Sequence, residues 1–112
     1  MAIKTKVKID NKVFEYVDRD SEVDAAGNVW VTKKKQGTVN IRWKRAKGET
    51  WKFVDPYITF QNDGAGDLKK LDTSEDRIRV QDKNSVLNTN IKYTLYTDAG
   101  NHDPLIVNRN GG

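Results

Sequence analysis

The sequence contains no cysteine, a single histidine and a single methionine, Met1. Without cysteine the chain forms no disulfide and offers no thiolate, either as a nucleophile or as a zinc ligand. It has no run of about 18 apolar residues, the length that a transmembrane helix needs. Met1–Lys6 alternates charged with apolar side chains and lacks the apolar core of a secretory signal, so we expect a cytoplasmic protein.

Helical periodicity is also missing, and proline is rare, with two residues in 112. No segment has the apolar spacing of an amphipathic helix. A chain of 112 residues is the size of one compact domain, so we expect a single domain over residues 1–112, with a polar tail at 108–112. Three Trp, four Tyr and three Phe argue against disorder, because each ring buries a large apolar area.

The sequence does contain a two-residue alternation of apolar and polar side chains. It is clearest in Ile3–Ile9, Val39–Lys44 and Ile91–Thr97, and it is typical of β-strands with one buried face. Turn-forming residues interrupt it about every ten residues, which is the spacing of a β-sandwich or a small barrel. We therefore predict an all-β fold, a single-domain antiparallel β-sandwich with an immunoglobulin-like Greek key and seven to nine short strands.

The phase of the alternation identifies the side chains that should face the core. Pro56 is expected to end the strand before it, because proline cannot donate to a sheet hydrogen bond. Leu68–Leu71 is predicted to form at most one turn of helix, and Asp98–Asn101 a hairpin turn. The predicted core residues are Ile3, Val7, Ile9, Val39, Ile41, Trp43, Trp51, Phe53, Ile58, Phe60, Ile78, Val80, Tyr93, Leu95 and Ile106.

Three segments of the C-terminal third carry a recognisable pattern: Val80–Asn84, Ile91–Leu95 and Asp103–Asn108. Together they resemble a group of small bacterial proteins that includes the DP-EP family, in which an Asp-x-Asn turn precedes a Tyr-rich strand and the chain ends in Asp-Pro-x-Ile. The resemblance implies a cupredoxin-like β-sandwich and brings no known activity. True cupredoxins bind copper through two His, a Cys and usually a Met, so His102 alone excludes a blue-copper site.

Catalytic groups are few. The possible nucleophiles are Ser21, Ser74 and Ser85, and the one imidazole that could act as a base is His102. We expect His102 to be exposed at the end of a hairpin. The acidic residues lie mostly in turns, where aspartate caps the backbone. We therefore predict a protein that is not an enzyme, with no catalytic residues and no cofactor.

The loop Asn62–Asp67 has the glycines and aspartates that suit a hard cation such as calcium. It lacks the spacing of an EF-hand and the glutamate at the twelfth position, and a calcium β-roll would need repeats. We predict a surface loop there and no metal site. Phosphate-binding glycine motifs are absent from the sequence.

A basic stretch with aromatic residues runs from Lys33 to Lys52, and this mixture is typical of single-stranded nucleic-acid binding. The alternation places Trp43 and Trp51 inward and the neighbouring cations outward, which weakens that interpretation. The row Lys4, Lys6 and Lys8 also suits an edge strand protected against aggregation. Trp30 and Tyr96 are the aromatic side chains that we expect to be exposed. The candidate surface-binding residues are Trp30, Tyr96, Lys33, Lys34, Lys35, Arg42 and Lys44.

The formal net charge is +4, which permits an anionic partner without requiring one. A small sandwich with sheet edges can dimerise or bind a peptide by strand addition. We therefore expect a protein that acts through a surface, by homo-oligomerisation or protein binding. The alternative is a nucleic-acid-binding β-domain that uses a basic-aromatic face.

Overall fold

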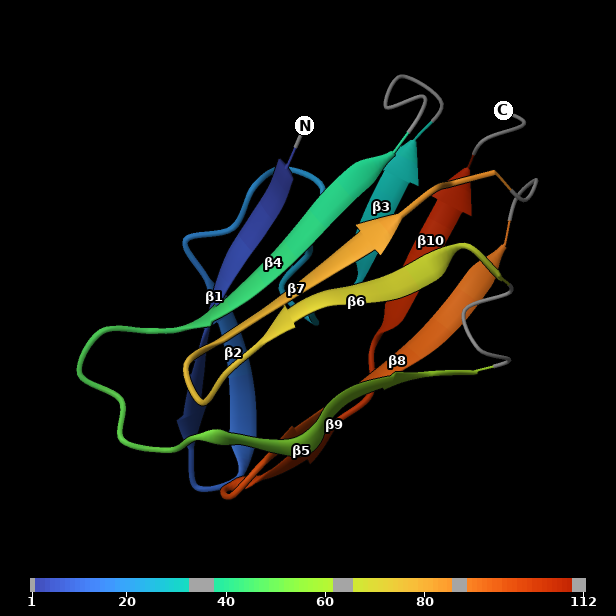
Figure 1. Cartoon of the computed structure of the whole chain (residues 1–112). Coiled ribbons are helices and arrows are strands. Elements are labelled where there is room, and N and C mark those ends of the chain that lie inside the picture. The colour runs from blue at the N-terminus through green and yellow to red at the C-terminus, as the bar shows by residue number, and fades with distance from the viewer. Residues whose placement is uncertain (1, 33–37, 62–65, 86–88, 110–112) are drawn as a thin grey trace.

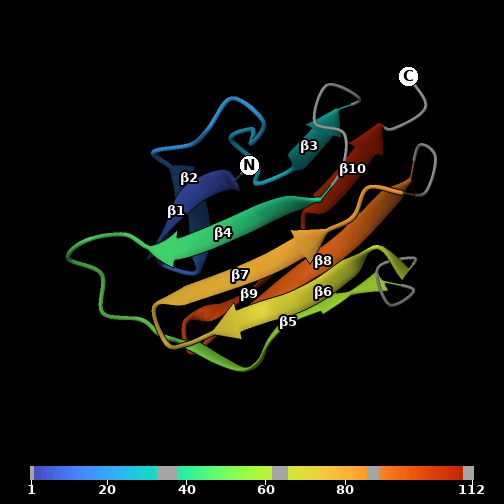
Figure 2. The same ribbon diagram turned by 45° about the horizontal axis from the view of Figure 1, so that its top comes forward.

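The computed structural model describes residues 2–32, 38–61, 66–85 and 89–109. Over these ranges the chain forms ten β-strands and no α-helix, in two sheets that face each other (Figures 1 and 2). The predicted all-β sandwich is therefore confirmed. The strands are β1 (Ala2–Asp10), β2 (Val13–Val17), β3 (Val29–Thr32), β4 (Val39–Arg45), β5 (Phe53–Phe60), β6 (Leu68–Thr73), β7 (Arg77–Asp82), β8 (Asn90–Thr97), β9 (Gly100–His102) and β10 (Leu105–Arg109).

The two sheets are mixed rather than purely antiparallel. The first has the order β2-β1-β4-β7-β6, and the second has the order β3-β10-β8-β5, with β9 also paired to β8. The pairs β1–β4 and β3–β10 are parallel, and the other pairs are antiparallel. β2 and β3 lie between β1 and β4 in the sequence, which gives the chain enough length to return in the same direction. The structure thus corrects both the antiparallel arrangement and the count of seven to nine strands.

The core lies between the sheets and follows the predicted alternation. All the predicted core residues are buried except Ile9 and Phe60, which are half-buried and pack against the core. The sequence did not assign Tyr16, Val29 and Val31, which are also buried. Each full-size apolar side chain removed from water contributes about 1.5–3 kcal/mol, so this cluster is the main source of stability.

Two segments differ from their predicted structure. Leu68–Leu71 belongs to strand β6, not to a helical turn, and a bulge between Lys70 and Asp72 interrupts its pairing with β7. Pro56 does not end its strand: β5 continues through it, with a register shift between Phe53 and Ile58. Proline is tolerated there because β5 is an edge strand, where its missing N–H breaks no ladder.

A chain of hydrogen bonds ties the two sheets together through the core. The indole Nε1 of Trp43 on β4 donates to the Tyr93 hydroxyl on β8 at 3.2 Å, and that hydroxyl donates to the carbonyl oxygen of Gly27 at 2.5 Å. Gly27 has φ of 87°, and a Cβ there would overlap the ring of Tyr16. Both the backbone conformation and the packing therefore require glycine at this position.

Candidate functional site

The outer face of the first sheet is strongly cationic. Residues that alternate with the core side chains of β1, β4 and β7 point to solvent, and the pairing of these three strands brings their basic residues together. Lys4, Arg42 and Arg79 lie in one cross-strand row, and Lys6, Lys44 and Arg77 lie in the next. We call this set the cationic face: Lys4, Lys6, Arg42, Lys44, Arg77 and Arg79.

The dimensions of the cationic face follow from sheet geometry. Neighbouring strands are about 4.8 Å apart, and alternate residues of a strand are about 6.7 Å apart. Six basic residues therefore have their Cα atoms within a patch of roughly 10 by 7 Å. Like charges placed directly opposite each other across two strands destabilise a sheet. The stability of the fold therefore does not explain why these basic residues lie together.

The carboxylates that form ion pairs with this patch among the described residues lie at its rim. Asp18, beyond β2, is 3.4 Å from Lys6, and Asp72 on β6 is 2.9 Å from Arg77 and 3.9 Å from Arg79. Lys4, Arg42 and Lys44 form no ion pair with any described residue. A carboxylate also lies at the Lys4 end of the first row, where Asp20 Oδ2 accepts a hydrogen bond from the Lys4 backbone N–H at 2.9 Å. The cations of the centre that have no carboxylate partner among the described residues are therefore Arg42 and Lys44.

Arg42 lies at the middle of this centre. Its side chain is half-buried between Lys4 on β1 and Arg79 on β7, and its Nε is buried without a hydrogen-bond partner in the described structure. An anion above the sheet would supply charge compensation for the guanidinium and for the neighbouring cations. The arrangement is thus chemically able to accept an anion above the sheet.

The lysines of β1 do not protect a sheet edge. The sequence suggested that role for Lys4, Lys6 and Lys8, but β2 pairs along Lys6–Asp10, which leaves β1 inside the sheet. The edges of the first sheet are β2 and β6. Edge protection therefore does not explain this row of charges.

Aromatic side chains are not part of the cationic face. Trp43 is 0% exposed and Trp51 6% exposed, and both point into the core as their alternation predicted. The outward positions of β1, β4 and β7 carry alanine, asparagine, glutamine, one aspartate (Asp10) and the basic residues, with no aromatic ring. The structure therefore separates the basic component of the predicted basic-aromatic face from its aromatic component.

The other candidate binding residues lie elsewhere. Trp30 is 43% exposed, as predicted, but it belongs to β3, an edge of the second sheet. Tyr96 is half-buried rather than exposed on the outer side of β8, with its hydroxyl 2.9 Å from that of Thr59. Lys33, Lys34 and Lys35 lie outside the described residues. Arg42 and Lys44 are thus the two predicted residues that the structure brings together.

Trp30 is held by a carboxylate. The Trp30 Nε1 donates to the Asp24 carboxylate at 3.5 Å. The Asp24 carboxylate also accepts hydrogen bonds from the backbone and side chain of Asn28 and from the Ala26 backbone. Burial alone would raise the pKa of Asp24, but these hydrogen bonds outweigh it and lower the pKa. Asp24 is a structural anchor for the turn that precedes β3.

His102 is half-buried rather than exposed, which corrects the sequence expectation. Its Nδ1 is 2.8 Å from the Tyr16 hydroxyl, and its ring stacks on Phe14 at a centroid distance of 5.1 Å. The hydroxyls of Ser21, Ser74 and Ser85 instead donate to the carboxylates of neighbouring acidic residues. The prediction that the protein is not an enzyme is not tested by these contacts and stays a prediction.

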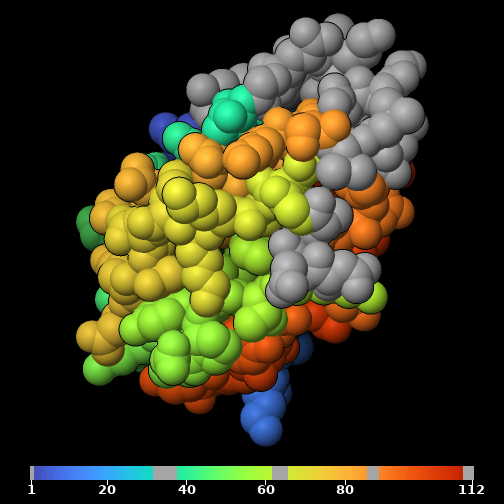
Figure 3. Space-filling model, turned by 45° about the vertical axis from the view of Figure 1, so that its right-hand side comes forward, coloured from blue at the N-terminus to red at the C-terminus, as the bar shows by residue number. Residues whose placement is uncertain are grey.

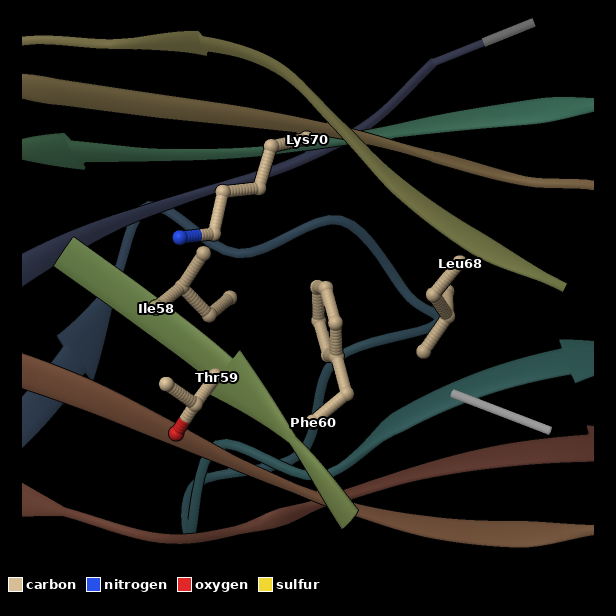
Figure 4. A pocket seen from close by; sticks show the side chains of 5 residues that line it. All are labelled: Ile58, Thr59, Phe60, Leu68 and Lys70. Atoms are coloured by element: carbon tan, nitrogen blue, oxygen red, sulfur yellow. The ribbon is translucent and has the colours of Figure 1, made fainter. Parts of the chain in front are cut away.

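A shallow groove lies between β5 and β6, the edge strands that meet on one side of the sandwich (Figures 3 and 4). Its volume is about 350 Å³. Ile58 and Phe60 point into it from β5, Thr59 points the other way, and Leu68 and Lys70 cover it from β6 (Figure 4). Lys70 donates to the Pro56 carbonyl oxygen at 2.9 Å, so this cation joins the two sheet edges.

Comparison with protein-family models finds no match, and comparison with curated proteins finds none either. The resemblance to the DP-EP family stays a prediction, and function must be inferred from the geometry of the molecule. In the described part of the chain, no helix is long and apolar enough to cross a membrane. Within the same ranges, no three histidine or acidic side chains cluster as metal ligands.

Proposed function

We propose that this protein binds nucleic acid through the cationic face, by contacts to the phosphate backbone. The observation that carries the proposal is the row of Lys4, Arg42 and Arg79 across three paired strands, in which the central Arg42 forms no ion pair with any described residue. Repulsion between these cations destabilises the free protein. The phosphates of a polyanion bound across the row would attract the cations and offset this repulsion. Phosphate contacts position a protein on nucleic acid without reading its sequence.

The lack of outward aromatic rings on β1, β4 and β7 determines the expected mode of binding. Without stacking platforms the bases contribute little, so single strands should gain no advantage over duplexes. We therefore expect affinity that is independent of sequence and falls steeply with salt. For four to six phosphate contacts on duplex DNA, the slope of log K against log salt concentration should be roughly −4 to −5.

A pair of matched double variants tests this proposal. Arg42→Gln with Lys44→Gln removes two charges from the centre of the cationic face. Arg109→Gln with Lys92→Gln removes the same charge from the second sheet, where Arg109 bonds Asn90 and Lys92 pairs with Asp103. Fluorescence anisotropy with a labelled mixed-sequence duplex measures affinity across a salt series.

We expect the first double variant to bind at least about tenfold more weakly, with a salt slope smaller by roughly 2, and the second to bind almost as wild type. Equal losses in the two variants would show a general charge effect and no defined face. Absence of salt-sensitive binding by the wild-type protein would reject the proposal outright.

Self-association is a second candidate, favoured by a separate observation. The exposed large apolar side chains of the described residues are Val13, Trp30, Val54 and Leu71, and each lies on a different edge strand. An edge strand that carries an apolar side chain can pair with a second copy of the chain. Light scattering on a size-exclusion column, at low and high salt, gives the mass: a salt-resistant dimer supports this candidate, and a monomer at all concentrations contradicts it.

A further inference from the structure

A second polar cluster lies at one end of the sandwich, apart from the cationic face. There β7 and β10 end and β6 begins, at the upper right of Figure 1. Four polar residues are almost completely buried at this end, with exposures between 0% and 3%: Asp67, Asp82, Asn84 and Asn108. They come from three segments that are distant in the sequence.

Hydrogen bonds hold these side chains in place. The Asp82 Oδ1 accepts from the Asn84 backbone N–H at 2.8 Å and from the Asn108 side-chain amide at 3.4 Å. The Asp67 carboxylate accepts from the Ser85 backbone N–H at 3.0 Å and from the Ser85 hydroxyl. The Asp82 carboxylate therefore lies between the two asparagines, and Asp67 is fixed next to the same turn.

Several atoms of the cluster nevertheless have no partner in the described structure. These are the second carboxylate oxygen of Asp82, the side-chain oxygen of Asn108, and both amide atoms of Asn84. A buried polar atom is normally hydrogen-bonded, because leaving it unpaired costs its full desolvation. Three unsatisfied oxygens in one buried place therefore call for an electropositive group.

The charges of the cluster support the same conclusion. Asp67 is 1% exposed and Asp82 0% exposed, and the two carboxylates are close enough for the charge of Asp67 to act on Asp82. No described lysine, arginine or histidine forms an ion pair with Asp82. Two carboxylates buried close together are stable as anions when a cation lies between them.

We propose that this end of the sandwich is a calcium site, formed by the carboxylates of Asp67 and Asp82 and the amide oxygens of Asn84 and Asn108. Calcium takes six to eight oxygen ligands in flexible geometry and accepts carboxylate and amide oxygens together. Two aspartates balance its charge, and water molecules complete the shell. Only two of these four ligands are acidic, and the other two are asparagines.

The site has a structural consequence. Asp67 precedes β6, Asp82 ends β7 and Asn108 lies in β10, so one ion would join the two sheets at this end. Calcium binding should therefore appear as stabilisation of the whole protein, independent of nucleic-acid binding. If the calcium proposal fails, the nucleic-acid proposal for the cationic face still stands. If the nucleic-acid proposal fails, the calcium proposal still stands.

Thermal unfolding of the full chain, treated with EDTA and then titrated with Ca²⁺ at constant ionic strength, tests the proposal. At a free Ca²⁺ concentration one hundred times the Kd, the Tm should rise on the order of 10 °C. Isothermal titration calorimetry should give one ion per chain. An unchanged Tm with no binding heat overturns the proposal, and an equal rise with Mg²⁺ overturns the assignment to calcium.

Two variants separate the site from a general effect of charge. Asp82→Asn removes a buried ligand and should abolish the Ca²⁺-dependent rise, while its Tm in EDTA should be at least that of the wild type. Asp10→Asn removes an exposed carboxylate at the end of β1 and should keep the full rise. If Asp82→Asn retains the rise, the site is elsewhere; if it does not fold, Asn108→Ala provides the same comparison.

Discussion

His102 is the one histidine of the chain, and its surroundings determine its protonation. Burial lowers its pKa below the ordinary value of 6.5, and the charge of Asp103 only partly opposes this effect. The neutral ring also keeps Nδ1 free to accept the hydrogen bond from the Tyr16 hydroxyl, whose own pKa burial raises well above its usual value. His102 therefore stabilises the native state as a neutral residue.

The direction of the pH effect follows from proton linkage. Below about pH 6.5 the unfolded state binds the His102 proton while the folded state does not, so stability falls as pH falls from 6.5 towards the folded pKa. In His102→Gln this component of the pH dependence should disappear. Urea denaturation between pH 7.5 and 5 measures it, and NMR titration of the one imidazole should give a midpoint below 6.5. A midpoint above that value would contradict the expectation.

At the scale of the strands, edges and cross-sheet contacts have different roles. The edge strands β5 and β6 are irregular, with register shifts in their pairing, and β6 also carries Lys69 and Lys70. Bulges and lysines on edges discourage pairing with other chains, so pairing with a second copy is expected at β2 or β3 rather than at β5 or β6. The central strands β4 and β8 are regular, and they are joined by the contact between Trp43 and Tyr93, whose ring centroids are 4.9 Å apart.

Tyr93→Phe tests this connection between β4 and β8. It should destabilise the protein by about 2–4 kcal/mol, because the Trp43 indole N–H loses its acceptor and the Gly27 carbonyl loses its donor, both in the core. Tyr96→Phe on the outer side of β8 is the matched control and should cost less than about 1 kcal/mol, since water can replace the bond to Thr59. Urea denaturation measures the free energy of unfolding of both variants. Equal losses in the two variants would show that the hydrogen bonds of Tyr93 stabilise the protein no more than the exposed bond of Tyr96 does.

At the scale of the whole molecule, a modest net charge of +4 hides a concentration of positive charge on one sheet. Repulsion within the cationic face should weaken the free protein at low ionic strength, and salt should relieve it, because exposed charges are screened beyond about 10 Å at 0.1 M. We expect the free energy of unfolding of the wild type to rise with added NaCl.

Arg42→Gln should reduce that rise, since Arg42 faces both Lys4 and Arg79. The difference between wild type and variant should be about 0.5 kcal/mol at low salt and should disappear at high salt. Arg109→Gln on the second sheet should behave as the wild type. Urea denaturation at several NaCl concentrations measures the effect, and a variant with an unchanged salt dependence would contradict the repulsion.

The alternation of the sequence was enough to locate the core and the outward direction of Arg42 and Lys44, because side-chain direction in a strand depends only on neighbouring residues. It could not place Lys4 or Arg79 next to Arg42, since strand pairing is a long-range property. The parallel β1–β4 pair in particular has no local sequence signal. The cationic face therefore emerged only when the strand order was known.

The buried polar cluster of Asp67, Asp82, Asn84 and Asn108 is a second case in which the sequence shows the residues but not their proximity. The loop that contains Asp67 has a composition that suits calcium, yet nothing local distinguishes Asp82, Asn84 and Asn108 from ordinary turn and strand residues. Their burial results from three strand ends meeting at one place. Composition and alternation by themselves determined the all-β class, the core and the exclusion of a blue-copper site. Tertiary structure alone decided which charges are neighbours, because electrostatic energy depends on distances across strands that the sequence separates.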